Sequence, residues 1–375
     1  MTRTPKCAKV CWGNERAHAK ARFPAAGVLA SLAILLAMPF MDSMSAANAD
    51  GLTKWSRLPS LPDPLGVAGC YAGVSGGALL VGGGANFSDE GPGGAPVKVW
   101  HDAVYALESP GGRWIRAGRL PRPLGYGVSV THEDAVLCVG GSDAARHYAD
   151  AFRLRWQAGR LLTEPLPALP IPLAHMSGAM VSNTLWIAGG AEAPGEQRAT
   201  SRVFALDLSR PPLVWREIEP IPGAPRFLAA AAARDGAFYV LGGAALAPSA
   251  DGKAVRVYLR EAWRYGPGSG WTRLRDLPKP SVAAPSPAPV IDGRILLLSG
   301  DDGSRVGFEP IERHPGFPDT ILAYDPARDR WSQNGQVPAP RATAPCVEWD
   351  GMFVVPSGEV RPRVRSPEVW SLRSR

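Results

Sequence analysis

A tryptophan-centred pattern that recurs along the chain limits the folds that this sequence can adopt. A Trp is followed after five residues by an aliphatic residue and Pro, and this pattern begins at Trp55, Trp114, Trp215, Trp271 and Trp331. A sixth copy ends in Leu166-Pro167 but carries Arg160 in place of the Trp. The six positions lie 46 to 60 residues apart. A self-match of this period indicates a chain built from repeated supersecondary units that pack on their neighbours.

Each unit carries further marks that predict its strands. An apolar run ends in a pair of small residues, as at 238–243, and an aromatic-centred run such as 262–265 follows it before the Trp. Segments rich in small residues, at 66–69, 177–179 and 229–233, suit inner strands that crowd a central axis. Four short strands at this period describe a propeller blade. The sequence therefore predicts an all-β, six-bladed propeller.

The two ends of the repeat array complement each other. The array begins with an isolated Trp55 pattern, and its last unit ends with an aromatic run at 368–372 that no Trp pattern follows. We therefore expect the N-terminal strand to close the last blade, which removes exposed sheet edges. Gly 42 and Pro 38 make up about a fifth of the chain, as expected for many strands and turns.

The first 49 residues have the pattern of a signal peptide. Basic residues precede an apolar stretch at 23–41, and Ala47-Asn48-Ala49 gives the small-x-small pattern of a cleavage site. A retained anchor is the alternative, although Pro24 and Pro39 bracket the apolar stretch. We expect residues 1–49 to be the signal and residues 50–375 the propeller. This predicts a periplasmic or secreted protein with no stable membrane association after cleavage.

Charge and cysteine content exclude further classes. Residues 1–49 hold six Lys/Arg and two acidic residues, so cleavage lowers the formal charge from +7 by 4, to +3. The remaining chain has no Lys/Arg run suited to a phosphate backbone, so a nucleic-acid partner is not expected. Cys70, Cys138 and Cys346 are expected to be buried thiols, with a Cys70–Cys346 bridge as the alternative if the first and last units are neighbours.

One charged stretch near the C-terminus stands out as a candidate site. Residues 356–366 follow the apolar run 352–355 and hold Glu359, Arg361, Arg363 and Arg365. The stretch starts at the place where the other units carry a glycine pair. A loop at this point of a rigid scaffold is where propellers build binding and catalytic sites.

These marks resemble kelch repeats, and the detailed sequence resembles the N-acetylneuraminate mutarotase (epimerase) family in a cyclically permuted form. The resemblance covers nearly all of residues 52–375 and is carried by 66–69 with 83–87, by 126–129, by 314–318, and by Ser357-Gly358-Glu359 with Arg365. Two positions depart from the family. Leu124 stands where the family has Arg, and Asp301-Asp302-Gly303 stands where many relatives have Gly-Val-Asn.

The resemblance implies an isomerase that interconverts the α and β anomers of free sialic acid (N-acetylneuraminate), with a sugar acid as partner and no cofactor. It implies Glu359 as the general acid/base and Arg365 as the ligand of the substrate carboxylate. Arg226 matches a family arginine and is a second candidate for binding, and Arg361 is expected to assist. Structural alternatives are charge neutralisation for Glu359 and a salt bridge for Arg226.

Two further residues are candidates from their position alone. Asn86 and Tyr126 lie beside inner-strand segments, where they are placed to hydrogen-bond sugar hydroxyls; packing is the alternative for Tyr126. His314, in a proline-rich segment, is expected to order its loop. Which sialic acid or other keto sugar is used, and the oligomeric state, stay open.

Other function classes find less support in the sequence. Beyond residue 49 the histidines are at 101, 132, 147, 175 and 314, without metal-ligand spacing, so no metal or copper-radical site is expected. A Ser-His-Asp hydrolase is not indicated either. The alternative that remains is a non-catalytic kelch module that binds carbohydrate or protein.

Overall fold

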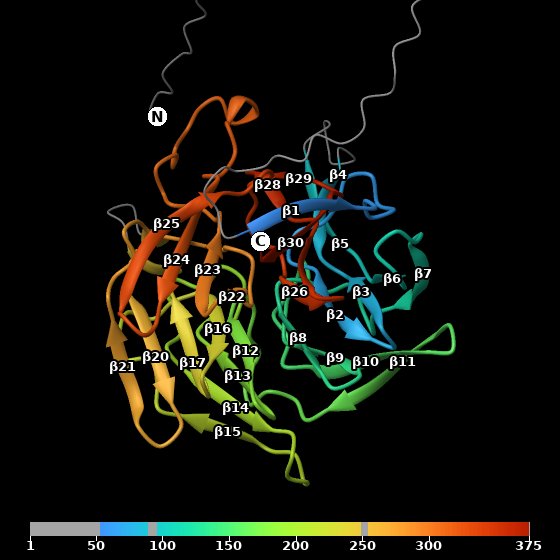
Figure 1. Ribbon diagram of the computed structural model, residues 1–375, viewed down its shortest axis with the longest axis horizontal. Helices are drawn as coiled ribbons and strands as arrows, with labels where there is room; N and C mark the ends of the chain where they lie inside the picture. The colour runs from blue at the N-terminus through green and yellow to red at the C-terminus, as the bar shows by residue number, and fades with distance from the viewer. Residues whose placement is uncertain (1–52, 89–95, 249–253, 375) are drawn as a thin grey trace, which may run out of the picture. The chain divides into compact units, whose positions relative to one another are not determined.

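The computed structural model describes residues 53–88, 96–248 and 254–374. Their regular structure is almost entirely β-strand, and the one helical element within these ranges is η2, a 3₁₀ turn at Ile311–Arg313. Six four-stranded antiparallel sheets form the blades of a β-propeller, as predicted (Figure 1). The expected signal peptide at 1–49 lies outside the described residues. Within the described ranges no helix is long and apolar enough to span a membrane.

The first three blades are consecutive along the chain, and the strands of each run in order from the propeller axis outward. Blade one has β2 (Tyr71–Ser75), β3 (Ala78–Gly82), β6 (Ala103–Leu107) and β7 (Ile115–Arg119). Blade two has β8 (Val128–His132), β9 (Ala135–Val139), β10 (Ala151–Gln157) and β11 (Arg160–Leu166). Blade three has β12 (Ser177–Val181), β13 (Thr184–Ala188), β14 (Val203–Asp207) and β15 (Trp215–Ile218).

The last three blades have the same order, and blade six joins the two ends of the propeller. Blade four has β16 (Ala230–Arg234), β17 (Ala237–Leu241), β20 (Ala262–Gly266) and β21 (Gly270–Leu274). Blade five has β22 (Val290–Ile291), β23 (Arg294–Leu298), β24 (Thr320–Asp325) and β25 (Arg330–Gln336). Blade six has β26 (Val347–Trp349), β27 (Met352–Pro356), β30 (Val369–Ser374) and β1 (Thr53–Leu58).

Blade six confirms the closure expected from the sequence. Strand β1 pairs with β30 in antiparallel register, with Trp55 opposite Leu372. Apolar side chains of blades one and six pack into a common cluster that includes Leu79, Val81 and Val354. The N-terminal strand therefore completes the outer edge of the last blade, and the ring is held together by buried apolar contacts between its first and last blades.

One inner strand lies later in the sequence than expected. The small-residue segments at 177–179 and 229–233 coincide with β12 and most of β16, but 66–69 is not the inner strand of blade one. Ala68 instead exchanges backbone hydrogen bonds with Ala85, and β2 begins only at Tyr71. The segment 66–69 makes a backbone contact near the axis instead. Small residues suit such a contact as well as they suit an inner strand.

Hairpins inserted between the second and third strands reach beyond the blades. Blade one carries β4 (Ala85–Ser88) and β5 (Val97–Trp100), blade four β18 (Ala244–Pro248) and β19 (Ala254–Tyr258), and blade six β28 (Glu359–Arg361) and β29 (Val364–Arg365). Strand β29 contacts β4. The inserted hairpins of blades one and six therefore lie side by side, although they are far apart in sequence (Figure 1).

The three cysteines of the propeller are buried and free, as expected. Burial raises the pKa of the Cys70 thiol to about 12 and raises the pKa of Cys138 and Cys346 as well. Cys70 and Cys346 are not bridged. All three residues belong to apolar clusters between neighbouring blades, so they act as small core residues.

Candidate functional site

A closed ring of backbone hydrogen bonds surrounds the propeller axis. Each ring residue donates its N–H to the carbonyl of the preceding one, at N···O distances of 2.6 to 2.8 Å. The ring consists of one residue from each of six equivalent places: Gly69, Tyr126, His175, Leu228, Ala283 and Thr343. All six have left-handed backbones, with φ between 51° and 65°. This conformation is costly for the five ring residues other than Gly69, because they carry a Cβ atom. Local backbone strain of this kind concentrates at functional sites.

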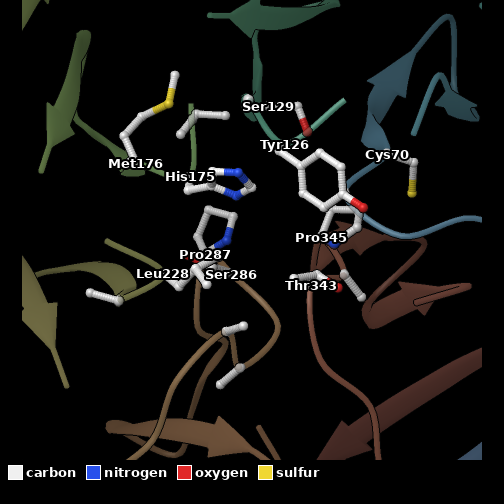
Figure 2. Close-up of a pocket in the computed structure, with 18 residues that line it drawn as sticks. Cys70, Tyr126, Ser129, His175, Met176, Leu228, Ser286, Pro287, Thr343 and Pro345 are labelled. Carbon is white, nitrogen blue, oxygen red and sulfur yellow. The ribbon is translucent and has the colours of Figure 1, made fainter. Parts of the chain in front are cut away.

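Ring side chains line two cavities on the axis. The axial cavity has a volume of about 80 Å³ and contains Tyr126 and His175 near its centre (Figure 2). Leu228 and Thr343 reach it from other blades. The same four side chains also line a second cavity of about 230 Å³, which we call the mouth cavity. The ring therefore forms the boundary between the axial cavity and the mouth cavity.

The mouth cavity gathers charged groups from several blade connections. Its charged lining residues are Lys98, Arg256, Asp301, Glu359 and Arg365. Its uncharged lining residues include three with hydrogen-bonding side chains, Tyr126, His175 and Thr343. The others are apolar: Phe317, Leu228, Val282, Ala283, Ala342 and Pro362. Three cationic and two acidic side chains in one partly apolar cavity suit a polar, anionic small molecule.

Glu359 and Arg365 face each other across the blade-six hairpin. They are register partners of β28 and β29, and Arg365 Nη1 lies 3.5 Å from Glu359 Oε1. The backbone N–H of Arg363 donates to the same Glu359 oxygen at 2.9 Å. The two side chains, 19% and 4% exposed, thus form a fixed pair at the edge of the cavity.

The guanidinium of Arg365 keeps donors available although it is almost fully buried. Its central carbon lies 4.7 Å from the ring centroid of Phe87. Within the described residues its Nε makes no hydrogen bond, and its Nη1 makes none beyond the 3.5 Å ion-pair contact with Glu359. A buried cation with unused donors favours binding of an anion such as a carboxylate.

Tyr126 and His175 are uncharged groups at the floor of the mouth cavity. Burial raises the pKa of Tyr126 to about 12, against the opposing effect of the nearby Arg365 guanidinium, so its phenol stays protonated. Burial, with His147 and Lys98 nearby, lowers the pKa of His175 to about 3, so its imidazole stays neutral. The two rings lie 4.9 Å apart between centroids. Both offer hydrogen bonds without adding charge.

Asp301 occupies the same repeat position as Glu359. In each blade connection, the residue before the ring residue bridges to the residue that follows the Gly-Gly or Ser-Gly pair. The six second members of these bridges are Ala85, Ser142, Ala191, Ala244, Asp301 and Glu359. Asp301 accepts hydrogen bonds from Tyr258 Oη at 2.6 Å and from the Gly303 N–H at 3.0 Å. Among these six described positions, only those of blades five and six hold a carboxylate, and both carboxylates line the mouth cavity.

The structure brings Glu359, Arg365 and Tyr126 together but places the other predicted site residues elsewhere. Arg226 is 1% exposed and pairs with the Glu261 carboxylate, and its guanidinium also donates to the carbonyls of Ala224 and Gly242. This is the structural alternative, a salt bridge, and Arg226 does not line the cavity.

Asn86 and Arg361 also serve contacts within the protein. Asn86 donates to the Gly66 carbonyl at 3.1 Å and contacts His101 Nε2 through its side-chain oxygen at 2.8 Å. Arg361 donates to the Glu312 carbonyl at 2.8 Å. Neither residue lines the mouth cavity, so we propose no substrate contact for them.

His314 orders its loop, as expected, since its Nδ1 accepts the Gly316 N–H at 3.1 Å. Within the described ranges, no three His, Cys, Asp or Glu side chains converge in a way that suits a metal ion.

Sequence reasoning did not single out Lys98, Arg256 or His175 as site residues. Lys98 and Arg256 lie on the hairpins inserted in blades one and four, at 85–100 and 244–258. The signal for these hairpins is the long interval between the glycine pair and the aromatic strand in those two units. His175 shares its ring position with Tyr126, and an alignment of the six units on this position would have found it.

Comparisons with known proteins agree with this architecture. Residues 42–163 match the model of the N-acetylneuraminate epimerase family. The resemblance to that family is confirmed over this part of the chain. The N-acetylneuraminate epimerase of Brucella suis is 37% identical over 132 residues, which cover 31% of this chain and 33% of the relative. That of Yersinia pestis (strain Pestoides F) is 39% identical over 113 residues, covering 26% and 27%.

The matched part has a limited extent. The chain spans about a third or less of the length of these curated relatives, and the match to the family model ends before Glu359 and Arg365. A solved structure, that of YjhT, superposes with a TM-score of 0.62 at 13% identity and covers 83% of this chain and 95% of that chain. This similarity confirms the propeller fold across nearly the whole described chain.

Proposed function

We propose that this protein accelerates the interconversion of the α and β anomers of a free sialic acid such as N-acetylneuraminate. The observation that carries the proposal is the mouth cavity, in which Glu359 stands 3.5 Å from the buried, donor-rich Arg365. The names of the relatives that match residues 42–163 support the same substrate class. The protein would therefore be an isomerase that moves protons on a sugar acid.

The charges of the cavity suit the acid group of this substrate. In a sialic acid the anomeric carbon C2 bears both the carboxylate and the anomeric hydroxyl. Arg365 has unused donors for the carboxylate, and Arg256 adds positive charge to the same cavity. A carboxylate held by Arg365 places the anomeric hydroxyl close to Glu359, because the two side chains are register partners.

Anomer exchange then needs two proton transfers. The Glu359 carboxylate accepts the proton of the anomeric hydroxyl as the bond between C2 and the ring oxygen breaks. The hydroxyl oxygen becomes the keto oxygen, and the ring oxygen takes up a proton. Rotation about the C2–C3 bond presents the other face of the ketone, and the reverse transfers close the ring as the opposite anomer. The reaction involves no net oxidation, so its chemistry requires only an acid and a base.

The direct test is the rate of anomer exchange. The pure β anomer of N-acetylneuraminate is dissolved, and the α and β signals are followed by proton NMR with and without the purified protein. We expect the approach to equilibrium to quicken in proportion to protein concentration and heat-unfolded protein to have no effect. If the folded protein binds the sugar but leaves the buffer rate unchanged, it is a non-catalytic carbohydrate-binding module.

We also propose that the protein acts after export, since residues 1–49 carry the basic, apolar and small-x-small pattern of a signal peptide. Fractionation of expressing cells and the mass of the isolated protein test this. A periplasmic or secreted chain that begins at Asp50 is expected. A full-length chain in the membrane fraction would support the retained anchor instead.

A further inference from the structure

Lys98 is a half-buried cation of the mouth cavity. It lies on β5, and its Nζ stands 4.0 Å from the ring centroid of Tyr126 and 4.6 Å from that of Trp100. The described residues hold no carboxylate within ion-pair distance of this ammonium. The two aromatic faces fix the position of the ammonium but use none of its three N–H donors, which stay available to a ligand.

The groups around Lys98 come from the neighbouring hairpin and from the axial ring. Arg365 on β29 and Glu359 on β28 interact with it electrostatically, and the phenol of Tyr126 lies beneath it. His175 lies within electrostatic range. Arg256 and Asp301 line the same cavity, and His101, on the chain beyond β5, is held by Asn86. Burial first, and then Arg365, lowers the pKa of Lys98 to about 8, while Glu359 opposes this shift.

We propose that Lys98 is the general acid that protonates the ring oxygen of the sugar while Glu359 accepts the proton of the anomeric hydroxyl. This inference rests on the function proposed above. As the ring opens, the electron pair of the C2–O bond goes to the ring oxygen, which takes a proton from the Lys98 ammonium. The open-chain ketone then stands between a neutral lysine and a protonated Glu359. Ring closure returns both protons, so each anomer exchange regenerates the two side chains.

The histidine, the tyrosine and the arginines that line the cavity are less suited to act as this acid. The imidazole of His175 is neutral because its pKa is lowered to about 3, and the phenol of Tyr126 is a weak acid with a pKa of about 12. Arginines do not release their protons near neutral pH. A general acid is most efficient when its pKa lies near the working pH, and Lys98 is both placed in the cavity and close to that range.

The test compares two replacements that separate charge from proton transfer. Lys98→Arg keeps a cation that can hold a carboxylate but does not donate a proton, and Lys98→Met removes both. We expect both variants to lower kcat by about 10²–10⁴-fold, the usual contribution of a general acid. Calorimetric binding of the 2-O-methyl glycoside of N-acetylneuraminate, which does not ring-open, should change less than about threefold in Lys98→Arg. This binding also shows that the variant is folded.

The pH profile gives a second readout on the unaltered protein. After subtraction of the buffer rate, kcat/KM should fall about tenfold per pH unit above roughly pH 8, because Lys98 of the free protein loses its proton there. Lys98→Arg should lose this alkaline limb. A wild-type profile without the limb, or full kcat in Lys98→Arg, would show that Lys98 only binds the anion and overturn the proposal. An inactive wild type would instead overturn the proposed function together with it.

Discussion

Blades five and six place a carboxylate at the same repeat position but surround it differently. Asp301 receives hydrogen bonds from two uncharged donors, the Tyr258 hydroxyl and the Gly303 N–H. Glu359 stands 3.5 Å from the Arg365 guanidinium and accepts the N–H of Arg363. Asp301 is thus held within its own network, whereas Glu359 shares its surroundings with a buried cation whose donors are partly unused.

This difference shows how a propeller turns one repeated position into two roles. The backbone bridge fixes where each side chain starts. The partners of Glu359 lie on the hairpin of its own blade, whereas Tyr258, the partner of Asp301, lies on the inserted hairpin of blade four. A carboxylate beside a cation that holds the substrate anion is placed to accept the proton of a hydroxyl on the neighbouring carbon. A carboxylate bound by neutral donors is placed to accept sugar hydroxyls. We therefore propose proton transfer as the role of Glu359 and substrate recognition as the role of Asp301.

The largest expected effect is that of Glu359→Gln. Glutamine keeps the size of the side chain and an acceptor for the Arg363 N–H, but it does not take up a proton from the substrate. We expect kcat to fall by about 10²–10⁴-fold, with the midpoint of thermal unfolding close to that of the wild type.

Exchange NMR on N-acetylneuraminate measures this rate, and circular dichroism checks the fold. Wild-type kcat in a folded Glu359→Gln protein would remove the proposed difference between the two carboxylates. Glu359 would then be a neutralising partner of Arg365.

A smaller effect is expected for Arg365→Met, which removes the partner that distinguishes Glu359 from Asp301. A charged hydrogen bond contributes about 1.5–3 kcal/mol, so we expect KM to rise by about 10–100-fold with a smaller change in kcat. Arg365→Lys is the matched control, since it keeps the charge but not the planar fork, and it should recover part of the loss. A loss confined to kcat would show that Arg365 acts on Glu359 and not on the substrate carboxylate.

The sequence predicted the scaffold well because the scaffold is repeated. The Trp patterns and glycine pairs fix the number of strands per blade, and the unmatched Trp55 pattern identifies the closing strand that pairs with β30. The resemblance to the epimerase family pointed to Glu359 and Arg365, and the structure places them as register partners of a short hairpin. The repeat marks depend on local spacing, which a sequence displays directly.

Residues whose role depends on neighbouring chain segments were harder to predict. The prediction that Arg226 binds substrate finds no support in the cavity, because this side chain donates to the Ala224 and Gly242 carbonyls inside the scaffold. Arg341 donates in the same way to the Ala339 and Ser357 carbonyls. The shared Pro-Arg of the two units is a structural repeat signal. Lys98 enters the site only because its hairpin lies beside β29, a tertiary contact with no sequence pattern.

The smallest expected effect is that of Asp301→Asn, which tests the other side of the comparison. Asparagine keeps an oxygen for the Tyr258 hydroxyl but loses the negative charge. If Asp301 only accepts a sugar hydroxyl, KM should rise by about 3–10-fold and kcat should change less than about twofold, as expected for one weakened hydrogen bond. Tyr258→Phe leaves the carboxylate in place and should have a still smaller effect on KM. Parallel kinetics on both variants and on Glu359→Gln separate the roles. A kcat in Asp301→Asn as low as that of Glu359→Gln would mean that both carboxylates transfer protons. The repeat position, and not the neighbouring arginine, would then decide which carboxylates take part in proton transfer.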